Sequence, residues 1–213
     1  KKEKLFLYGD NNAKRLLIYG LGARNKTTLD HMRSEGANIY NYANSKKISK
    51  ISISLSSFKV NSKDTLQSFI EGVFLGSYYF NEHKNTKNKK NFTKSLDLIN
   101  EEVEESFLDS VANISMALGE SVSLARDLGN EPANICTPTY LAETVKKIAK
   151  SKNMKSAIFD IKEFEKMKLG SFYGVAKGAK EPAKLILVEY SGGAKGEAPI
   201  GLIGKGLTFD TGG

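Results

Sequence analysis

Short apolar runs alternate with segments of helical period in the N-terminal half of the chain. Residues 15–20, RLLIYG, have the pattern of a buried strand, and residues 51–55, ISISL, alternate as a half-buried strand does. Helices are predicted over about 28–43, capped by Thr27 or Thr28, and over about 64–80. Their predicted inward-facing residues are Leu29, Met32, Ile39 and Ala43 in the first helix, and Leu66, Phe69, Ile70, Val73 and Phe74 in the second. This half of the chain therefore predicts an α/β unit.

A long amphipathic helix is predicted from about Glu105 to Leu128, because apolar residues recur there at three- and four-residue steps. Gly129, which adds backbone freedom, and Pro132, which blocks continuation, predict where it ends. The residues of its predicted apolar stripe are Phe107, Leu108, Val111, Ile114, Leu118, Val122, Ala125 and Leu128.

Strands and helices alternate again beyond this helix. Thr137 and Pro138 predict the cap and first turn of a helix whose inward-facing residues are Leu141, Val145 and Ile148. Strands are predicted over 157–161 and 183–190, the second apolar enough to be central, with a short helix over 162–168 between them. The apolar run at 200–203 predicts a final buried strand. The alternation predicts a mixed or mostly parallel sheet covered on both faces.

Composition narrows the class of protein. Hydrophobic residues make up 40% and charged residues 26% of the 213 residues, as in soluble globular proteins. Apolar stretches are too short for a membrane span or a signal peptide, so a cytoplasmic location is expected. The single cysteine, Cys136, excludes an intramolecular disulfide and is interpreted as a structural thiol. The net charge of +8 comes from scattered lysines and one dense stretch at 84–94, which predicts an exposed loop.

Lys205 and Asp210 carry the candidate chemistry, because they follow the last apolar run in a glycine-rich loop. A phosphate-binding loop is excluded, since Pro199 and Gly206 stand where glycine and Ser or Thr are needed. The DTG at 210–212 resembles an aspartic-protease signature, but there is no second copy and the helical patterns contradict an all-β fold. Two interpretations remain: a divalent-metal site with a neutral lysine amine, and an ordinary Lys205–Asp210 ion pair, which spacing alone favours.

Other chemistry-bearing residues are interpreted as structural. Gly20 and Gly22 form part of a dinucleotide-type loop, but Asn25 stands where its third glycine belongs. His83 is predicted to be a solvated side chain, because it has no ligand-spaced partner nearby. The same is predicted of His31, which lies on the polar side of a predicted helix. The polar side chains at the end of the long helix are expected to anchor it to the second domain; they are Arg126, Asp127 and Asn130.

The last ten residues, GKGLTFDTGG at 204–213, resemble the first metal-binding motif of the leucyl aminopeptidases, the M17 metallopeptidase family. Further matches to this family follow its order: GVFLGSYYF at 72–80, ARDLGNEPAN at 125–134, TPTYLAE at 137–143 and LVEYSGG at 187–193. The resemblance covers nearly the whole chain, weakly before Leu66 and strongly after Leu124. On these motifs the chain is identified as a member of the family.

The resemblance implies a two-metal aminopeptidase, using zinc or manganese, that removes N-terminal residues of the leucine type from peptides with free N-termini. It implies that Lys205 binds one metal ion and that Asp210 lies between both ions. The family's remaining carboxylate ligands, catalytic lysine and catalytic arginine would lie beyond Gly213, so no catalytic residue is expected within this chain. The chain alone is expected to be inactive and, lacking an initiating methionine, to be a portion of a longer protein. A hexamer is implied by the family, with no membrane or nucleic-acid partner.

The expected fold is α/β, with three parts. The resemblance implies that residues 1–104 form a macro-like N-terminal domain, residues 105–130 a linking helix, and residues 131–213 the truncated start of a metallopeptidase catalytic domain with a mixed sheet. A non-catalytic alternative is a nucleotide-binding or assembly module, because macro-like domains often bind nucleotides and the chain is basic.

Overall fold

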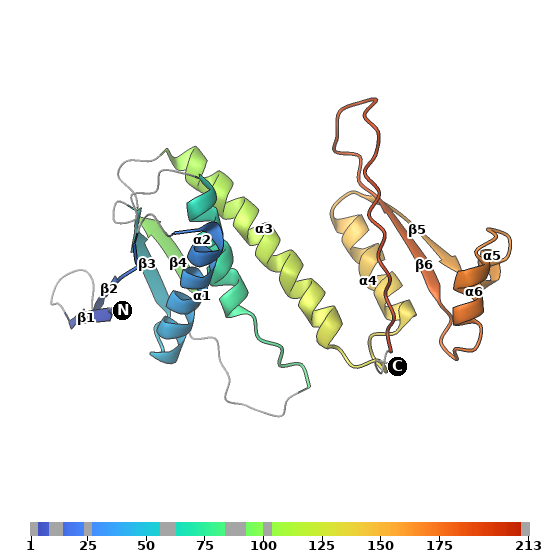
Figure 1. The fold of residues 1–213 in the computed structure, drawn as a ribbon, viewed down its shortest axis with the longest axis horizontal. Coiled ribbons are helices and arrows are strands. Elements are labelled where there is room, and N and C mark those ends of the chain that lie inside the picture. Colours follow the sequence, from blue (N-terminus) through green and yellow to red (C-terminus); the bar gives the residue numbers. More distant parts are fainter. Residues whose placement is uncertain are drawn as a thin grey trace. The chain divides into compact units, whose positions relative to one another are not determined.

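A computed structural model describes residues 4–8, 15–23, 27–55, 63–83, 93–99 and 104–209, the first of these segments by its backbone. The chain divides into two compact units, one ending at Arg126 and the other beginning at Asp127. Strands and helices alternate through both units, as the sequence predicted (Figure 1). Among the described residues, no helix has both the length and the apolar character needed to cross a membrane.

The first unit begins with an antiparallel ribbon of β1 (Lys4–Tyr8) and β2 (Arg15–Tyr19), in which Lys4 lies opposite Tyr19. Strand β1 was not predicted from the sequence. Strand β2 was predicted as a buried strand, which is wrong, because Leu16 and Ile18 are each 52% exposed. Only alternate residues of β2, Leu17 and Tyr19, are half-buried. Side chains of a strand point to opposite faces, and β2 has one partly covered face.

Helix α1 (Leu29–Ser45) begins directly after Thr28, one of the two residues predicted to cap it. The side chain of Thr28 accepts a hydrogen bond from the backbone N–H of His31 at 3.1 Å, which confirms Thr28 as the N-cap. Of its predicted inward-facing residues, Met32, Ile39 and Ala43 are buried. Leu29, the first residue of the helix, is 45% exposed and was wrongly predicted to face inward.

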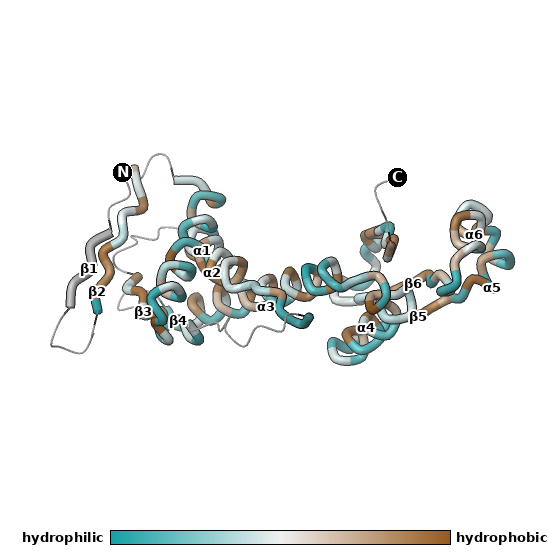
Figure 2. The backbone as a smooth tube through the Cα atoms, turned by 90° about the horizontal axis from the view of Figure 1, so that it is seen from below, coloured by the Kyte–Doolittle hydropathy of each residue, from teal (hydrophilic) through white to brown (hydrophobic). Residues whose placement is uncertain are grey.

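Helix α2 (Lys63–Ser77) is the crossover between two parallel strands, β3 (Lys50–Ser54) and β4 (Ser95–Ile99), in which Lys50 lies opposite Ser95. Parallel strands need such a connection, and a helix is the usual one. The half-buried alternation predicted for β3 is confirmed, whereas β4 was not predicted. Figure 2 shows alternating hydrophobic and polar stretches along α1 and α2, the pattern of helices with one buried face.

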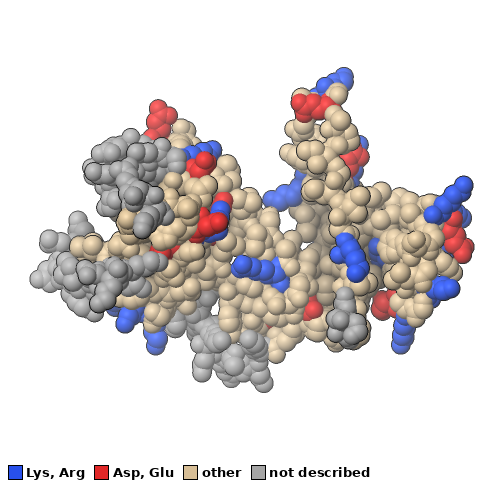
Figure 3. Space-filling view, in the orientation of Figure 1, with Lys and Arg blue, Asp and Glu red and all other residues tan. Residues whose placement is uncertain are grey.

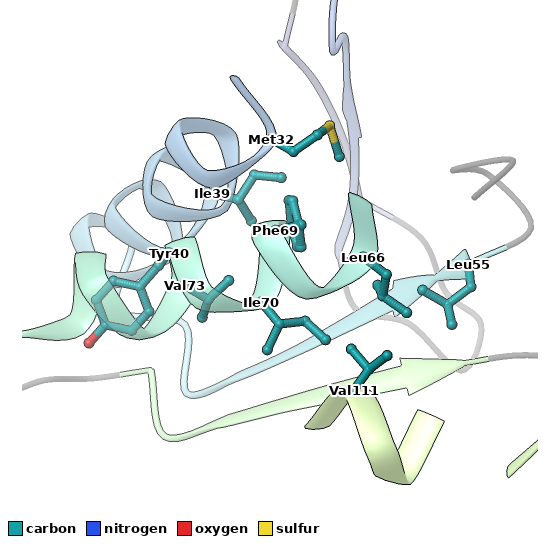
Figure 4. Close-up of a cluster of buried hydrophobic side chains, with 9 residues drawn as sticks. All are labelled: Met32, Ile39, Tyr40, Leu55, Leu66, Phe69, Ile70, Val73 and Val111. Carbon is teal, nitrogen blue, oxygen red and sulfur yellow. The ribbon is translucent and has the colours of Figure 1, made fainter. Parts of the chain in front are cut away.

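The hydrophobic core of the first unit is centred on α2 (Figure 4). Phe69 is 0% exposed and Leu66 is 1% exposed, as the helical period predicted. Half-buried residues of β3 and β4, such as Ile53 and Leu98, pack against the same cluster. The buried members are Met32, Ile39, Tyr40, Leu55, Leu66, Phe69, Ile70, Val73 and Val111.

Helices α1 and α2 run parallel and in very close contact. Gly72 lies against Arg33 and Gly76 against Ala37, so both contacts keep the same sequence offset. A Cβ at Gly36 would lie 2.0 Å from the carbonyl oxygen of Phe69, which shows that the backbones touch there. Glycine is required at such a contact because no side chain fits between the helices.

The long helix is α3 (Glu105–Asn130), but its buried face differs from the predicted stripe. Val111, Ser115 and Gly119 are buried, whereas Ile114 and Leu118 are 39% and 44% exposed. The reason is close packing, because a Cβ at Gly119 would lie 2.6 Å from the side chain of Phe74. Gly119 thus packs against α2, and Ser115 beside it is buried, whereas Ile114 and Leu118 are exposed. Gly129 lies inside the helix, and the left-handed glycines of the described residues are Gly22 and Gly196.

The second unit contains α4 (Pro138–Ser151), β5 (Lys155–Asp160), α5 (Ile161–Phe164), α6 (Gly170–Ala176) and β6 (Lys184–Glu189). Thr137 caps α4 as predicted, accepting a hydrogen bond from the N–H of Tyr140 at 3.2 Å. The predicted helix at 162–168 is shorter than expected: α5 ends at Phe164, and Lys168 in the following turn has a φ of 58°, a left-handed conformation that no helix continues. Helix α6 was not predicted.

Strands β5 and β6 form an antiparallel pair, with Lys155 opposite Glu189 and Asp160 opposite Lys184. The mixed or mostly parallel sheet expected for this unit stays a prediction, because its described strands form one antiparallel pair. In this pair β6 is not the central strand that was predicted, since Leu187 is 50% and Val188 45% exposed. The first unit contains a parallel pair of strands and the second an antiparallel pair, so the chain is an α/β protein with both kinds of pairing.

Candidate functional site

The segment that leads to Lys205 leaves β6 and forms neither helix nor strand over residues 190–207. Ile200, Leu202 and Ile203 are 90%, 94% and 102% exposed, so the predicted final buried strand is wrong for this structure. A strand is held by hydrogen bonds to a neighbour, and in the described part of this unit β5 and β6 pair only with each other. The apolar run has no strand beside it here.

Lys205 is exposed and makes no ion pair or side-chain hydrogen bond with any described residue. Asp210 lies outside the described residues. Metal ligation and a Lys205–Asp210 ion pair both stay predictions. An amine and a carboxylate suit a divalent ion as donors, but within the described residues no group of three His, Cys, Asp or Glu side chains could complete such a site.

A buried carboxylate, Glu35 on α1, is the titratable group that sequence analysis missed. Its side chain is 0% exposed, and the hydroxyl of Tyr19 donates a hydrogen bond to its Oε2 at 2.5 Å. Burial, this hydrogen bond and the charge of Glu35 together raise the pKa of Tyr19 to about 12. The sequence held a signal, because Glu35 lies three residues after Met32 and four before Ile39, on the buried face of the helix.

His31 joins the same group and is not the solvated side chain that was predicted. Its ring is 30% exposed, its Nε2 lies 2.8 Å from the carbonyl oxygen of Leu21, and its Nδ1 lies 3.7 Å from Glu35. With Nε2 protonated, the ring donates to Leu21, so that the Gly20–Gly22 turn is tied to α1. Residues 24–26, which include Asn25, lie outside the described residues. The contacts of His31 with Leu21 and Glu35 are thus structural contacts.

Arg126 also differs from its predicted role. Its Nη1 donates a hydrogen bond to the carbonyl oxygen of Leu75 at 3.2 Å, and its guanidinium lies 5.2 Å from the ring centroid of Tyr78. Both partners belong to the first unit, so Arg126 ties α3 to the end of α2 rather than to the second domain. The anchoring roles predicted for Asp127 and Asn130 stay predictions.

Cys136 is a buried thiol, 6% exposed, in the loop before α4. Burial, and then the nearby negative charge of Glu131, raise its pKa, so the thiol stays protonated at neutral pH. This supports the interpretation of a structural thiol. His83 is exposed, as predicted, and its ring lies 5.7 Å from that of Phe80. Figure 3 shows the described Lys and Arg side chains of one face in small separate groups with Asp and Glu between them, so no single basic patch forms there.

Two family models match the chain, in order. The N-terminal domain of the cytosol aminopeptidase family matches residues 1–87, and the catalytic domain of the same family matches residues 123–213. The chain belongs to the cytosol aminopeptidase family. This confirms the resemblance that was based on the motifs from residue 72 onward.

Relatives agree with this family membership. The chain is 35% identical over 205 residues to a probable cytosol aminopeptidase of Pseudomonas syringae pv. tomato, covering 94% of this chain and 41% of that protein. It is 35% identical over 219 residues to a probable cytosol aminopeptidase of Alkaliphilus oremlandii, covering 99% of this chain and 44% of the relative. The chain thus spans less than half the length of these cytosol aminopeptidases.

Solved structures confirm the α/β fold. A mutant tomato leucine aminopeptidase superposes with a TM-score of 0.73 at 26% identity, covering 86% of this chain and 37% of that one. The bottromycin maturation enzyme BotP in complex with Mn superposes with a TM-score of 0.73 at 19% identity, covering 89% of this chain and 39% of that one. Because BotP is only 19% identical, its superposition is evidence for the fold alone.

Proposed function

We propose that the protein to which this chain belongs is a metal-dependent aminopeptidase that releases N-terminal residues of the leucine type from peptides. The observation that carries the proposal is the ordered match of both domains of one peptidase family, at 1–87 and 123–213. The superposition on a leucine aminopeptidase supports it independently of the family models. The natural substrates of such an enzyme are peptides with a free α-amine.

Lys205 and Asp210 are the residues of this chain that would hold metal. Asp210 would supply a carboxylate able to bridge two ions, and Lys205 a neutral amine to one of them. Divalent ions such as Mn²⁺ or Zn²⁺, when bound, polarise the scissile carbonyl and acidify water. The support is the match of the catalytic-domain model through Gly213 and the donor chemistry of the two side chains.

The 213-residue chain alone is proposed to lack turnover. It spans 41% of one relative, and its described residues offer no cluster of metal-binding side chains. Two ligands do not fill the coordination sphere that zinc or manganese requires. The full protein is proposed to be a cytoplasmic hexamer, with 1–104 as an assembly domain, 105–130 as its linking helix and 131–213 as the start of the catalytic domain.

The experiment is an assay of the full-length protein with leucine amide or a leucine anilide. Activity is measured before chelation, after metal removal, and after addition of Mn²⁺ or Zn²⁺. The proposal expects activity to vanish with the metal and to return with it. Full activity in the metal-free protein, or inhibition by an aspartic-protease inhibitor, would contradict the proposal.

A further inference from the structure

The second unit contains a hollow of about 310 Å³ between α5, the turn that follows it, and α6. This volume is at the small end of the range of ligand pockets, which runs from about 300 to 1,000 Å³. It suits a molecule of amino-acid size rather than an extended peptide. The residues that line it are Ile161, Lys162, Glu165, Tyr173 and Lys177.

The backbone around this hollow is held in place by packing and hydrogen bonds. Phe164 is 0% exposed and stacks on Phe172, with ring centroids 4.4 Å apart and planes tilted by 26°. The N–H of Leu169 donates to the carbonyl of Phe164 at 2.8 Å, and the N–H of Lys177 donates to that of Tyr173 at 2.9 Å. The backbone on the two sides of the hollow is therefore held in place, so a ligand would need to order only the side chains that line it.

Four polar residues line the hollow from these two sides. Lys162 and Glu165 are three residues apart on one side, and Tyr173 and Lys177 are four apart on the other, the spacings that place helical residues on one face. Among the described residues, none of these four side chains has an ion-pair or hydrogen-bond partner. Lys162, Glu165 and Lys177 are exposed and Tyr173 is half-buried, and all four line the same hollow. They bring two amines, one carboxyl group and one phenol to it.

We propose that this hollow binds a free acidic amino acid, such as L-glutamate. Lys162 and Lys177 bind its carboxylates, Glu165 binds its ammonium group, and the hydroxyl of Tyr173 adds a hydrogen bond. The two lysines and one glutamate carry a net charge of +1, which complements the net charge of −1 on the ligand. An inorganic anion would match the lysines but be repelled by Glu165. The inference concerns binding alone and does not depend on Lys205, Asp210 or peptidase activity.

The test is a titration of the isotope-labelled 213-residue chain with L-glutamate, followed by the backbone amide NMR signals of Tyr173 and Lys177. The proposal expects saturable shifts with a dissociation constant of roughly 1 mM or tighter. Glutarate, which lacks the amine, is expected to bind about tenfold more weakly, because it leaves Glu165 unpaired. Lys162→Ala and Lys177→Ala should each weaken glutamate binding by about tenfold or more.

The matched control is Lys180→Ala, which removes an exposed lysine that does not line the hollow and should leave binding unchanged. Glu165→Gln should abolish the preference for glutamate over glutarate. Circular dichroism establishes that each variant is folded. The proposal is overturned by any of three results: no saturable shift up to about 20 mM glutamate, inorganic phosphate binding as tightly as glutamate, or equal losses from Lys180→Ala and Lys177→Ala.

Discussion

The main-chain carbonyl oxygen of Arg33 on α1 lies directly against the Cα of Gly72 on α2, where a Cβ would be only 1.9 Å away. The two parallel helices are therefore in backbone contact at this point. Beside the contact, Nε and Nη2 of Arg33 donate to Oε2 of Glu71 at 3.1 and 3.0 Å, and Gln67 donates to the other oxygen of Glu71 at 2.8 Å. The spacing of α1 and α2 is thus fixed by a glycine and bordered by a charged hydrogen-bond network.

Replacement of this glycine is expected to destabilise the chain. Gly72→Ala should lower the free energy of unfolding by about 1–3 kcal/mol, because the helices must separate to admit the methyl group. The control is Gly129→Ala in α3, where an added Cβ meets nothing within 4 Å. That variant should be neutral or more stable by roughly 0.5 kcal/mol, since alanine favours the helix. Chemical denaturation followed by circular dichroism measures both, and equal effects would contradict the close contact.

Two tyrosines, the half-buried Tyr19 and the buried Tyr40, are expected to respond differently to loss of the hydroxyl. Tyr19→Phe should cost about 1.5–3 kcal/mol, because it removes a hydrogen bond to the buried carboxylate of Glu35. The hydroxyl of Tyr40 is buried with no partner among the described residues. Tyr40→Phe should therefore leave stability unchanged or raise it, by up to about 1–3 kcal/mol. Chemical denaturation again measures the free energy of unfolding of both variants. A larger loss of stability in Tyr40→Phe than in Tyr19→Phe would contradict the hydrogen bonding assigned to the two hydroxyls.

The raised pKa of Tyr19 predicts a pH dependence of stability at alkaline pH. A pKa of about 12 in the folded chain, against the ordinary value of 10.0, means that the folded state binds the phenolic proton more tightly than the unfolded state. This contribution is complete below about pH 10 and is lost as pH rises toward about 12. Stability measured across that window should fall less steeply in Tyr19→Phe than in the wild type. Parallel profiles would show that Tyr19 contributes nothing to the slope.

The sequence predicted the main helices well because their signals are local. Thr28 and Thr137 cap α1 and α4 as expected, and the period of α2 identified Leu66 and Phe69 as core residues. The buried face of α3 was mispredicted at Ile114, because hydrophobicity alone ranks it above the small Ser115 and Gly119 that pack against α2. Close packing favours small residues, which a hydrophobic pattern does not reveal.

The candidate site was less predictable from local pattern. Lys205 and Asp210 were chosen through family resemblance, since their spacing alone favoured an ion pair. The apolar run at 200–203 resembles a buried strand, but a strand is buried only when neighbouring strands flank it. The burial of Glu35 was missed because its main partner, Tyr19, lies 16 residues away in sequence. Such pairings depend on the tertiary fold.

The metal content of Lys205→Arg in the full-length protein tests the central claim most directly. Arginine keeps the positive charge but cannot offer a neutral amine, because guanidinium stays protonated at any practical pH. If Lys205 is a metal ligand, this variant loses at least one of the two proposed ions per subunit and its peptidase activity, while circular dichroism shows an intact fold. The control, Lys195→Arg in the exposed turn before Gly196, keeps both. Two ions per subunit and near-normal turnover in Lys205→Arg would contradict the proposed role of Lys205 and reduce it to an ion-pair partner.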